Sequence, residues 1–441
     1  MPPPIDPCQI EFDLIDDLLA GLIRVSAEQL WPDFDPATLP LAVAIPSQRS
    51  TWLINHETAD GYLVVRTDAS GLLRRDGLND RIVAHSIAMI ADRLTATIIV
   101  DDPRRVAEAT ALAAHELFHV HQAEHYPEWG ANEASQLAWP WHDAENLARS
   151  IHESSLLNAA LSATADETSL AIARQALARR RDRFDHLVPE ARAYESAVEL
   201  AEGTARFVEH RTATLLGAQF PEEEDVNTID VRRRCYRTGQ DWCALLQRLT
   251  GPDWTARLPS GADGAMPILP DLLEAAIGPP PTKPDERWRD NLSWATAEIS
   301  AERTRRQERV GLLRGVLGGS VVIRARPDAP PQVARFGLMN LTPLPDGQVL
   351  HERYLSLMLG ETRITALNHS TLTTVAGDHP LFAGPARAEI LIDAGLVMGP
   401  EDGTPHDVAI LGIEITGPYT LRRAGPQAVE LLPGTTPPDG R

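Results

Sequence analysis

The apolar residues follow three successive patterns along the chain, and each pattern predicts a different type of structure. Residues 10–25 have the apolar spacing of an amphipathic helix, and several short β-prone runs follow it. Residues 102–278 have a mostly helical composition. From Ser320 onward, short β-prone runs alternate with Gly/Pro turns. The chain is therefore expected to be an α+β protein with a small N-terminal sheet, a mostly helical middle and a C-terminal all-β domain.

The individual elements are predicted from runs of β-branched residues and from helical spacing. The N-terminal strands are expected at residues 41–45, 51–54, 62–65, 82–87 and 94–100. The helices of the middle region are expected at residues 142–163, 168–184, 190–216 and 241–249. A further helix is expected to begin at Asp101-Asp102-Pro103, an acidic cap followed by proline, and to end before Pro127.

Changes in composition divide the chain into four regions. Residues 278–284 are rich in Gly and Pro and predict a linker, which a charged helix at 288–317 follows. The residues after Pro433 are expected to be disordered. The resulting regions are an N-terminal α+β subdomain (1–101), a helical region (102–278), a linker with a charged helix (279–319) and a C-terminal β-domain (320–441).

The strongest chemical signal is the pentapeptide His115-Glu116-Leu117-Phe118-His119, which lies within a predicted helix. Two imidazoles one helical turn apart lie on one face and can bind a single Zn²⁺. Glu116 can then accept a proton from a metal-bound water. Two histidines that bind no metal would give the same pentapeptide, but the helical context favours a metal site. We therefore expect zinc-dependent hydrolysis, with a peptide bond as the substrate.

A second predicted helix carries Glu202-Gly203-Thr204-Ala205, which begins the pattern Glu-Gly-x-Ala-x-Phe-x-Glu. Together with the pentapeptide, this pattern resembles the gluzincin metallopeptidases. The resemblance implies a zincin-like catalytic region in which His115, His119 and Glu202 bind zinc and Glu116 is the general base. It also implies that Gly203 allows close helix packing. The chain departs from the best-known gluzincins in two ways: His119 and Glu202 are far apart in sequence, and the Gly-Ala-Met-Glu-Asn motif of the aminopeptidases is missing. The subfamily is therefore unassigned.

The sequence leaves other third ligands open. His125 has the spacing of a metzincin ligand, but Gln122 stands where that pattern has glycine. A helix continuing through Gln122 would carry His125 about 15 Å along the axis from His115. Further alternatives are Glu195, Glu199, Asp143 and Glu145.

The residues around Glu202 form a polar stripe along their predicted helix. This stripe comprises Glu195, Glu199, Glu202, Arg206 and Glu209. It could be a surface face. If it instead faces the zinc helix, Glu199 and Arg206 become candidates to orient or neutralise the ligands.

Two further parts of a hydrolytic site have only weak signals. Tyr236, in a segment expected to precede a helix, is the first candidate for a donor to the oxyanion, and His210 and Tyr194 are others. The strand at 94–100 leads directly into the site helix. It is therefore a candidate edge to which an extended substrate could add.

The formal net charge of -21 makes nucleic acid and anionic membrane surfaces poor partners. The run at 179–183, with four arginines, is interpreted as a solvated helix face. Cys8, Cys235 and Cys243 do not form a disulfide framework. No export signal or membrane-spanning run is visible, so a cytoplasmic location is expected.

The leading hypothesis is a zinc metallopeptidase that acts on a peptide or protein. The alternative is a catalytically silent zinc-binding scaffold that binds partners through the β-domain. The intact Glu116 argues against a scaffold, which would not need a general base. Hydrolysis of a non-peptide amide is a third possibility, and the oligomeric state is not predicted.

Overall fold

A computed structural model describes residues 7–66, 71–82, 84–218, 229–258, 266–325, 331–337, 341–375, 384–394, 412–417 and 419–433. The chain forms two compact units. The first contains Met1–Ala131, Asn146–Leu187 and Arg192–Asn291, and the second contains Asn132–Glu145, Val188–Ala191 and Leu292–Arg441. Helices and sheets occupy different parts of the chain, which confirms the α+β class. The tail expected to be disordered lies outside the described residues.

Six strands of the first unit form a mixed sheet in the order β3-β4-β2-β1-β6-β5. Their bounds are β1 Leu41–Ile45, β2 Ser50–Ile54, β3 Leu63–Arg66, β4 Leu72–Asp76, β5 Ser86–Ile90 and β6 Arg93–Ile99. β6 pairs parallel to β1 and antiparallel to β5. Because β6 has a neighbour on both sides, the prediction that residues 94–100 form a substrate-binding edge is wrong. β5 is the edge strand of the described sheet on that side.

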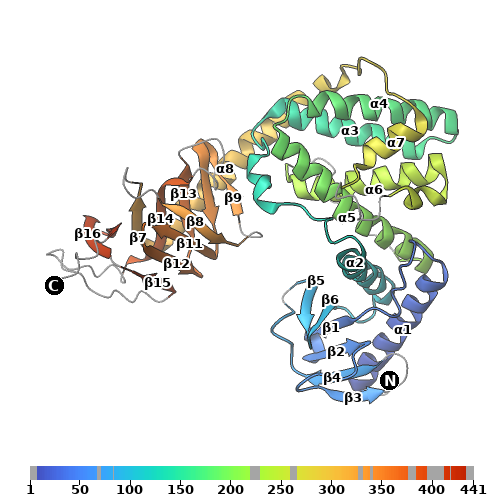
Figure 1. Ribbon diagram of the computed structural model, residues 1–441, viewed down its shortest axis with the longest axis horizontal. Helices are drawn as coiled ribbons and strands as arrows, with labels where there is room; N and C mark the ends of the chain where they lie inside the picture. The colour runs from blue at the N-terminus through green and yellow to red at the C-terminus, as the bar shows by residue number, and fades with distance from the viewer. Residues whose placement is uncertain are drawn as a thin grey trace, which may run out of the picture. The chain divides into compact units, whose positions relative to one another are not determined.

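Helices α1 (Pro7–Ala27) and α2 (Val106–His125) pack on one face of this sheet (Figure 1). In β1, Leu41 and Val43 join the core that the two helices complete, whereas Ala42 and Ala44 join a smaller cluster on the opposite face. The strand is therefore buried on both faces. This burial fixes the position of β6, and hence of the helix that follows it.

Helix α2 begins at Val106, later than the Asp-Pro signal predicted. The Asp102 carboxylate accepts a hydrogen bond from the Arg104 N–H, and the Asp102 carbonyl accepts one from the Arg105 N–H. These bonds form a turn that precedes the helix. The signal therefore marked the turn rather than the first helical residue.

The remaining helices of the first unit are α3 Ala144–Ser162, α4 Asp166–Phe184, α5 Pro189–Leu216, α6 Val231–Thr250 and α7 Leu269–Ile277. The first three agree with the predicted segments. Helix α6 is much longer than the predicted 241–249, because Gly239 lies inside the helix instead of before it. Cys235 and Cys243 both lie buried and free in α6.

The second unit is a β-sandwich preceded by helix α8 (Leu292–Leu317). One sheet has the order β16-β17-β7-β14-β13-β10-β9 and the other has the order β15-β12-β11-β8. Apolar residues from both sheets share one core, which includes Ile323, Ile390 and Leu357. The bounds are β7 Gly318–Arg324, β8 Gln332–Phe336, β9 Leu341–Pro343, β10 Gln348–His351, β11 Tyr354–Leu359, β12 Thr362–Leu367, β13 Thr371–Val375, β14 Pro385–Asp393, β15 Ile413–Thr416, β16 Tyr419–Gly425 and β17 Ala428–Pro433.

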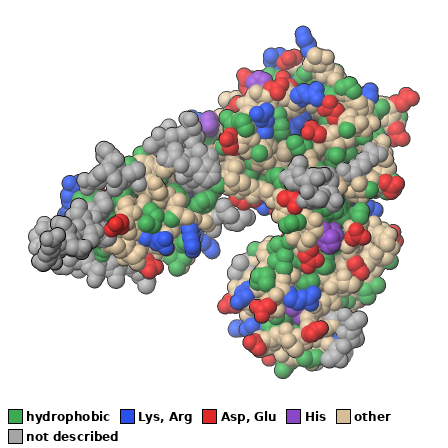
Figure 2. Space-filling model, in the orientation of Figure 1, with side chains coloured by type: hydrophobic (Ala, Val, Ile, Leu, Met, Phe, Trp, Pro, Cys, Tyr) green, Lys and Arg blue, Asp and Glu red, His purple; other side chains and the backbone are tan. Residues whose placement is uncertain are grey.

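Acidic and basic side chains are interspersed over the face of the molecule that Figure 2 shows. None of the described helices has both the length and the apolar character that crossing a membrane requires.

Candidate metal centre

Three predicted ligands converge at one point between α2 and α5. The His119 Nε2 atom lies 3.1 Å from the His115 Nε2 atom and 3.1 Å from the Glu202 Oε2 atom. The third distance, from His115 Nε2 to Glu202 Oε2, is 3.7 Å. Donors on a tetrahedral ion with bonds of about 2.05 Å lie about 3.3 Å apart. Two imidazole nitrogens and one carboxylate oxygen therefore fit Zn²⁺ in both type and spacing.

The Gln122 side chain of α2 joins this helix to α5, because its Nε2 donates to the Ala201 carbonyl and to the Thr204 hydroxyl, both at 2.9 Å. These bonds fix the position of α5 along α2, and therefore place the Glu202 side chain opposite the two histidines.

Each histidine is oriented by a hydrogen bond at its second ring nitrogen. The His115 Nδ1 atom lies 3.0 Å from a Glu209 carboxylate oxygen, and the His119 Nδ1 atom lies 2.7 Å from Gln122 Oε1. Such bonds fix the ring and leave Nε2 for the metal. Burial favours neutral His115, but bonds to Glu202 and Glu209 outweigh it and raise its pKa to about 10. Without a metal, a proton is therefore held where the ion would bind.

The other oxygen of Glu202 is held by helix α6. The Arg232 guanidinium donates to Glu202 Oε1 at 2.6 Å. Although burial opposes ionisation, bonds to the two histidines hold the pKa of Glu202 well below its usual range. Glu202 is therefore a carboxylate with one oxygen directed at the histidines and one bound to arginine.

Tyr236 lies inside helix α6, so its predicted place before a helix is wrong. Its ring stacks on His115 with centroids 6.2 Å apart and an interplanar angle of 9°. Burial and then the Glu202 charge raise the pKa of the Tyr236 phenol. The hydroxyl thus stays protonated and can donate a hydrogen bond beside the metal centre.

Glu116 is buried, with 6% of its surface exposed. Within the described part of the chain, its carboxylate has no hydrogen-bond or ion-pair partner. Burial raises its pKa, and the charges of His115 and His119 oppose this shift. A carboxylate with raised basicity and no competing partner is suited to accept a proton.

The structure separates the alternative ligands from this group. The His125 ring stacks on His121 at 4.1 Å, and His121 packs in turn against Phe34 and Phe118. Asp143 accepts a hydrogen bond from the Glu145 N–H at the start of α3. Neither His125 nor these acidic residues belong to the group formed by His115, His119 and Glu202.

A second group of metal-binding atom types, Glu195, Glu199 and Cys235, also lies close together. Both carboxylates already accept hydrogen bonds from buried arginines: Arg183 donates to Glu195 and Arg180 donates to Glu199. A cation there would have to displace guanidinium groups. The chemistry therefore favours the first group as the metal centre.

Helix α5, which carries Glu202, packs closely against α6. A Cβ atom added to Gly203 would lie 2.4 Å from the Gly239 Cα atom. No side chain can occupy either position without moving one helix. This geometry agrees with the close packing that the resemblance implied for Gly203, and it identifies α6 as the partner.

Three orienting residues were not predicted: Glu209, Gln122 and Arg232. Glu209 could have been found, since it lies two helical turns after Glu202 on the same polar stripe. No protein-family model, curated protein or solved structure matches the chain. The functional argument therefore rests on the geometry of these residues.

Proposed function

We propose that this protein is a zinc-dependent metallopeptidase. The observation that carries the proposal is the tetrahedral spacing of His115 Nε2, His119 Nε2 and Glu202 Oε2, with Glu116 adjacent in sequence to the first ligand. Three protein ligands leave a fourth position open, as in catalytic zinc sites, whereas structural sites use four. The resemblance to gluzincins in the two sequence motifs supports the same function.

The side chains divide the reaction between them. When bound, zinc would supply a Lewis acid that polarises a carbonyl and lowers the pKa of water. Glu116 accepts the proton of the attacking water and returns it to the leaving amine. The Tyr236 hydroxyl donates to the oxygen that becomes negative as the carbonyl carbon turns tetrahedral. Glu209 and Gln122 hold the two imidazoles in place.

The proposed binding edge for an extended substrate is strand β5. This strand has a neighbour on only one side of the described sheet, and its Ile87 and Met89 side chains are 36% and 51% exposed. His85, just before the strand, is close enough to Glu209 and His115 for their charges to affect its pKa. A peptide added along β5 would therefore run toward the metal centre.

The first experiment measures the zinc content of the purified protein and of Glu202→Ala by elemental analysis. We expect about one zinc per chain, because three ligands form one site, and a sharp decrease in the variant. Glu190→Ala, an exposed position at the start of the same helix, is the control and should retain zinc. Equal zinc in Glu202→Ala and the unaltered protein would exclude Glu202 as a ligand.

A second experiment separates a peptidase from a silent zinc scaffold. Glu116→Gln should keep its zinc and lose hydrolysis of a mixed set of fluorescence-quenched peptides. Glu124→Gln is the control, because Glu124 is an exposed residue of the same helix. Hydrolysis by the unaltered protein that survives in Glu116→Gln would exclude Glu116 as the base, and zinc binding without hydrolysis of any peptide would favour the scaffold.

A further inference from the structure

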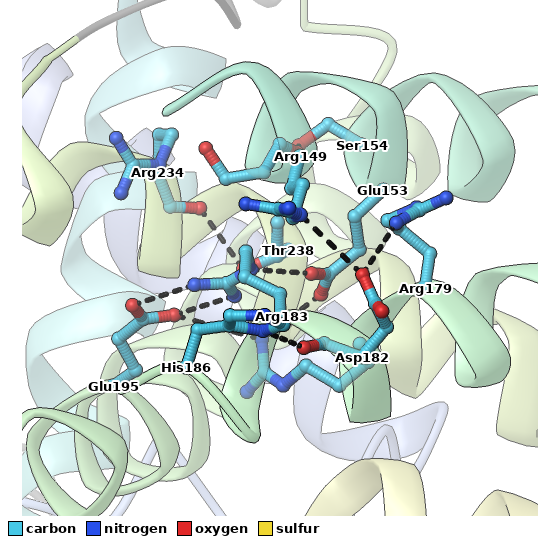
Figure 3. A network of polar contacts seen from close by, with 12 residues as sticks. Arg149, Glu153, Ser154, Arg179, Asp182, Arg183, His186, Glu195, Arg234 and Thr238 are labelled. Atoms are coloured by element: carbon cyan, nitrogen blue, oxygen red, sulfur yellow. Dashed lines mark hydrogen bonds and ion pairs between the residues drawn. The ribbon is translucent and has the colours of Figure 1, made fainter. Parts of the chain in front are cut away.

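A network of charged side chains lies buried among helices α3, α4, α5 and α6, and Figure 3 shows it from close by. Arg180 and Arg183 of α4 meet Glu153 of α3 and two carboxylates of α5, Glu195 and Glu199. All five residues are at most 4% exposed. The prediction that the arginine run at 179–183 forms a solvated helix face is therefore wrong for Arg179, Arg180 and Arg183, which are all buried, whereas the Arg181 side chain is 57% exposed. The carboxylates that pair with Arg180 and Arg183 are distant in sequence, so the local charge pattern did not reveal them.

Three buried arginines and three buried carboxylates form the centre of this network. Arg234 of α6 is also buried and adds a third positive charge, which interacts with Glu195. Three guanidinium groups thus face three carboxylates. Burying charges is favourable only where the geometry satisfies them, and replacing such pairs with apolar residues is often neutral for stability. Stability alone therefore does not explain the network.

Glu199 connects the network to the helices that form the metal centre. One of its oxygens accepts hydrogen bonds from Arg180 at 2.8 Å and from the Thr238 hydroxyl at 2.6 Å. Thr238 lies on α6, next to Gly239, and Glu199 lies one helical turn before Glu202 on α5. The Glu199–Thr238 bond therefore crosses from α5 to α6 beside the Gly203–Gly239 contact.

We propose that Glu199 and Thr238 are positioning residues, which set the level of α5 along α6 and thereby hold Glu202 in the geometry that binds the metal. This inference rests on the proposed metal centre. Neither residue belongs to the ligand group, so each acts through the helix that carries it. The Gly203–Gly239 contact sets the distance between the two helices. Because it is a contact of backbone against backbone, it does not fix the position of α5 along the axis of α6. The directional hydrogen bond between the Glu199 carboxylate and the Thr238 hydroxyl does fix that position.

The required accuracy supports this role. A slip of one residue along a helix moves a side chain by about 1.5 Å. Metal–ligand distances tolerate only about 0.2 Å. Glu202 also contacts Arg232 of α6, so its position depends on the relation between α5 and α6. Even a small part of a one-residue slip would therefore weaken zinc binding.

The test compares the zinc affinity of Thr238→Val, which removes the hydroxyl at constant volume, with that of Thr238→Ser, which restores it. Thr212→Val is the matched control, because Thr212 is a fully buried residue of α5 whose hydroxyl has no hydrogen-bond partner among the described residues. Affinity is measured by competition with a chromophoric chelator. The visible spectrum of the Co²⁺-substituted protein reports ligand geometry, and denaturation of the metal-free proteins reports stability.

We expect Thr238→Val to bind zinc about tenfold more weakly, at the lower end of effects seen for residues that support metal ligands. Its Co²⁺ spectrum should change, whereas Thr238→Ser and Thr212→Val should resemble the unaltered protein in both measurements. Should Thr238→Val not fold, Glu199→Gln takes its place, with the same expected direction.

Two results would overturn the inference. Thr238→Val with lower stability but unchanged zinc affinity and Co²⁺ spectrum would show a merely structural role and leave the metal centre intact. A chain that binds no zinc before any substitution would overturn the metal centre itself, and this inference with it.

Discussion

Replacing Gly203 with alanine tests the helix contact on which the metal centre depends. The new methyl group would lie 2.4 Å from the Gly239 Cα atom and 2.6 Å from its carbonyl carbon, both of which are backbone atoms. Relief to an ordinary contact of 3.4 Å requires a movement of about 1.0 Å, the difference between 3.4 and 2.4 Å. Glu202 is the adjacent residue, so its carboxylate would move with the backbone. A movement of that size is several times larger than the tolerance of about 0.2 Å in a metal–ligand distance.

We expect Gly203→Ala to lower the free energy of unfolding by about 2–3 kcal/mol, near the upper end for overpacking. Zinc affinity should fall by about 100-fold, the larger effect seen when ligand support is lost. Denaturant titration of the metal-free protein and chelator competition measure the two quantities. Gly311→Ala is the control, since this glycine of α8 has open space around its added methyl group and alanine favours a helix by up to about 1 kcal/mol. A Gly203→Ala variant with unchanged stability and zinc affinity would refute the close contact of α5 and α6.

Three other predictions concern the centre itself. Glu209→Gln should weaken zinc binding about tenfold, because His115 loses a charged partner, and calorimetry that finds equal affinity would contradict this role. Tyr236→Phe should lower kcat about 100-fold with little change in zinc content, as expected for loss of one oxyanion donor, and an unchanged kcat would remove Tyr236 from the reaction. The raised pKa of His115, about 10, implies that its contribution to the stability of the metal-free protein is fully present below about 6.5, its unfolded value, and is lost as the pH rises through about 10. Zinc binding at neutral pH should therefore release a proton, and calorimetry in two buffers of different ionisation enthalpy that detects no release would contradict this protonation state.

The sequence was sufficient for the parts of the site that depend on local geometry. Helical periodicity alone places His115 and His119 on one face of a helix. It also places Glu202 and Glu209 on one stripe of α5. It does not say which way that stripe turns, so the role of Glu209 as the partner of His115 required the structure. Arg206 lies on the same stripe but bonds to Gln240 of α6.

Several of the wrong predictions share a physical cause, because the deciding partner comes from a distant segment of the chain. The helix predicted at 241–249 was too short, since α6 continues through Gly239, whose contact with Gly203 on α5 is a tertiary one. The order of strands in the sheet depends on a crossover, so the internal position of β6 could not follow from its place in the chain. Strand type and helix length are local properties, whereas pairing order and charge compensation are not.

The separation of the ligands along the chain has a consequence for folding kinetics. His119 and Glu202 are 83 residues apart. Bringing the ends of a flexible segment of that length together costs about 4 kcal/mol of chain entropy. Helices α3 and α4, which lie within this segment, form through local contacts, so we expect them to fold before α5 meets α2. An ion held by both α2 and α5 would then stabilise contacts that form late. It would slow unfolding far more than it would accelerate folding, and a chelator would shorten the lifetime of the native state.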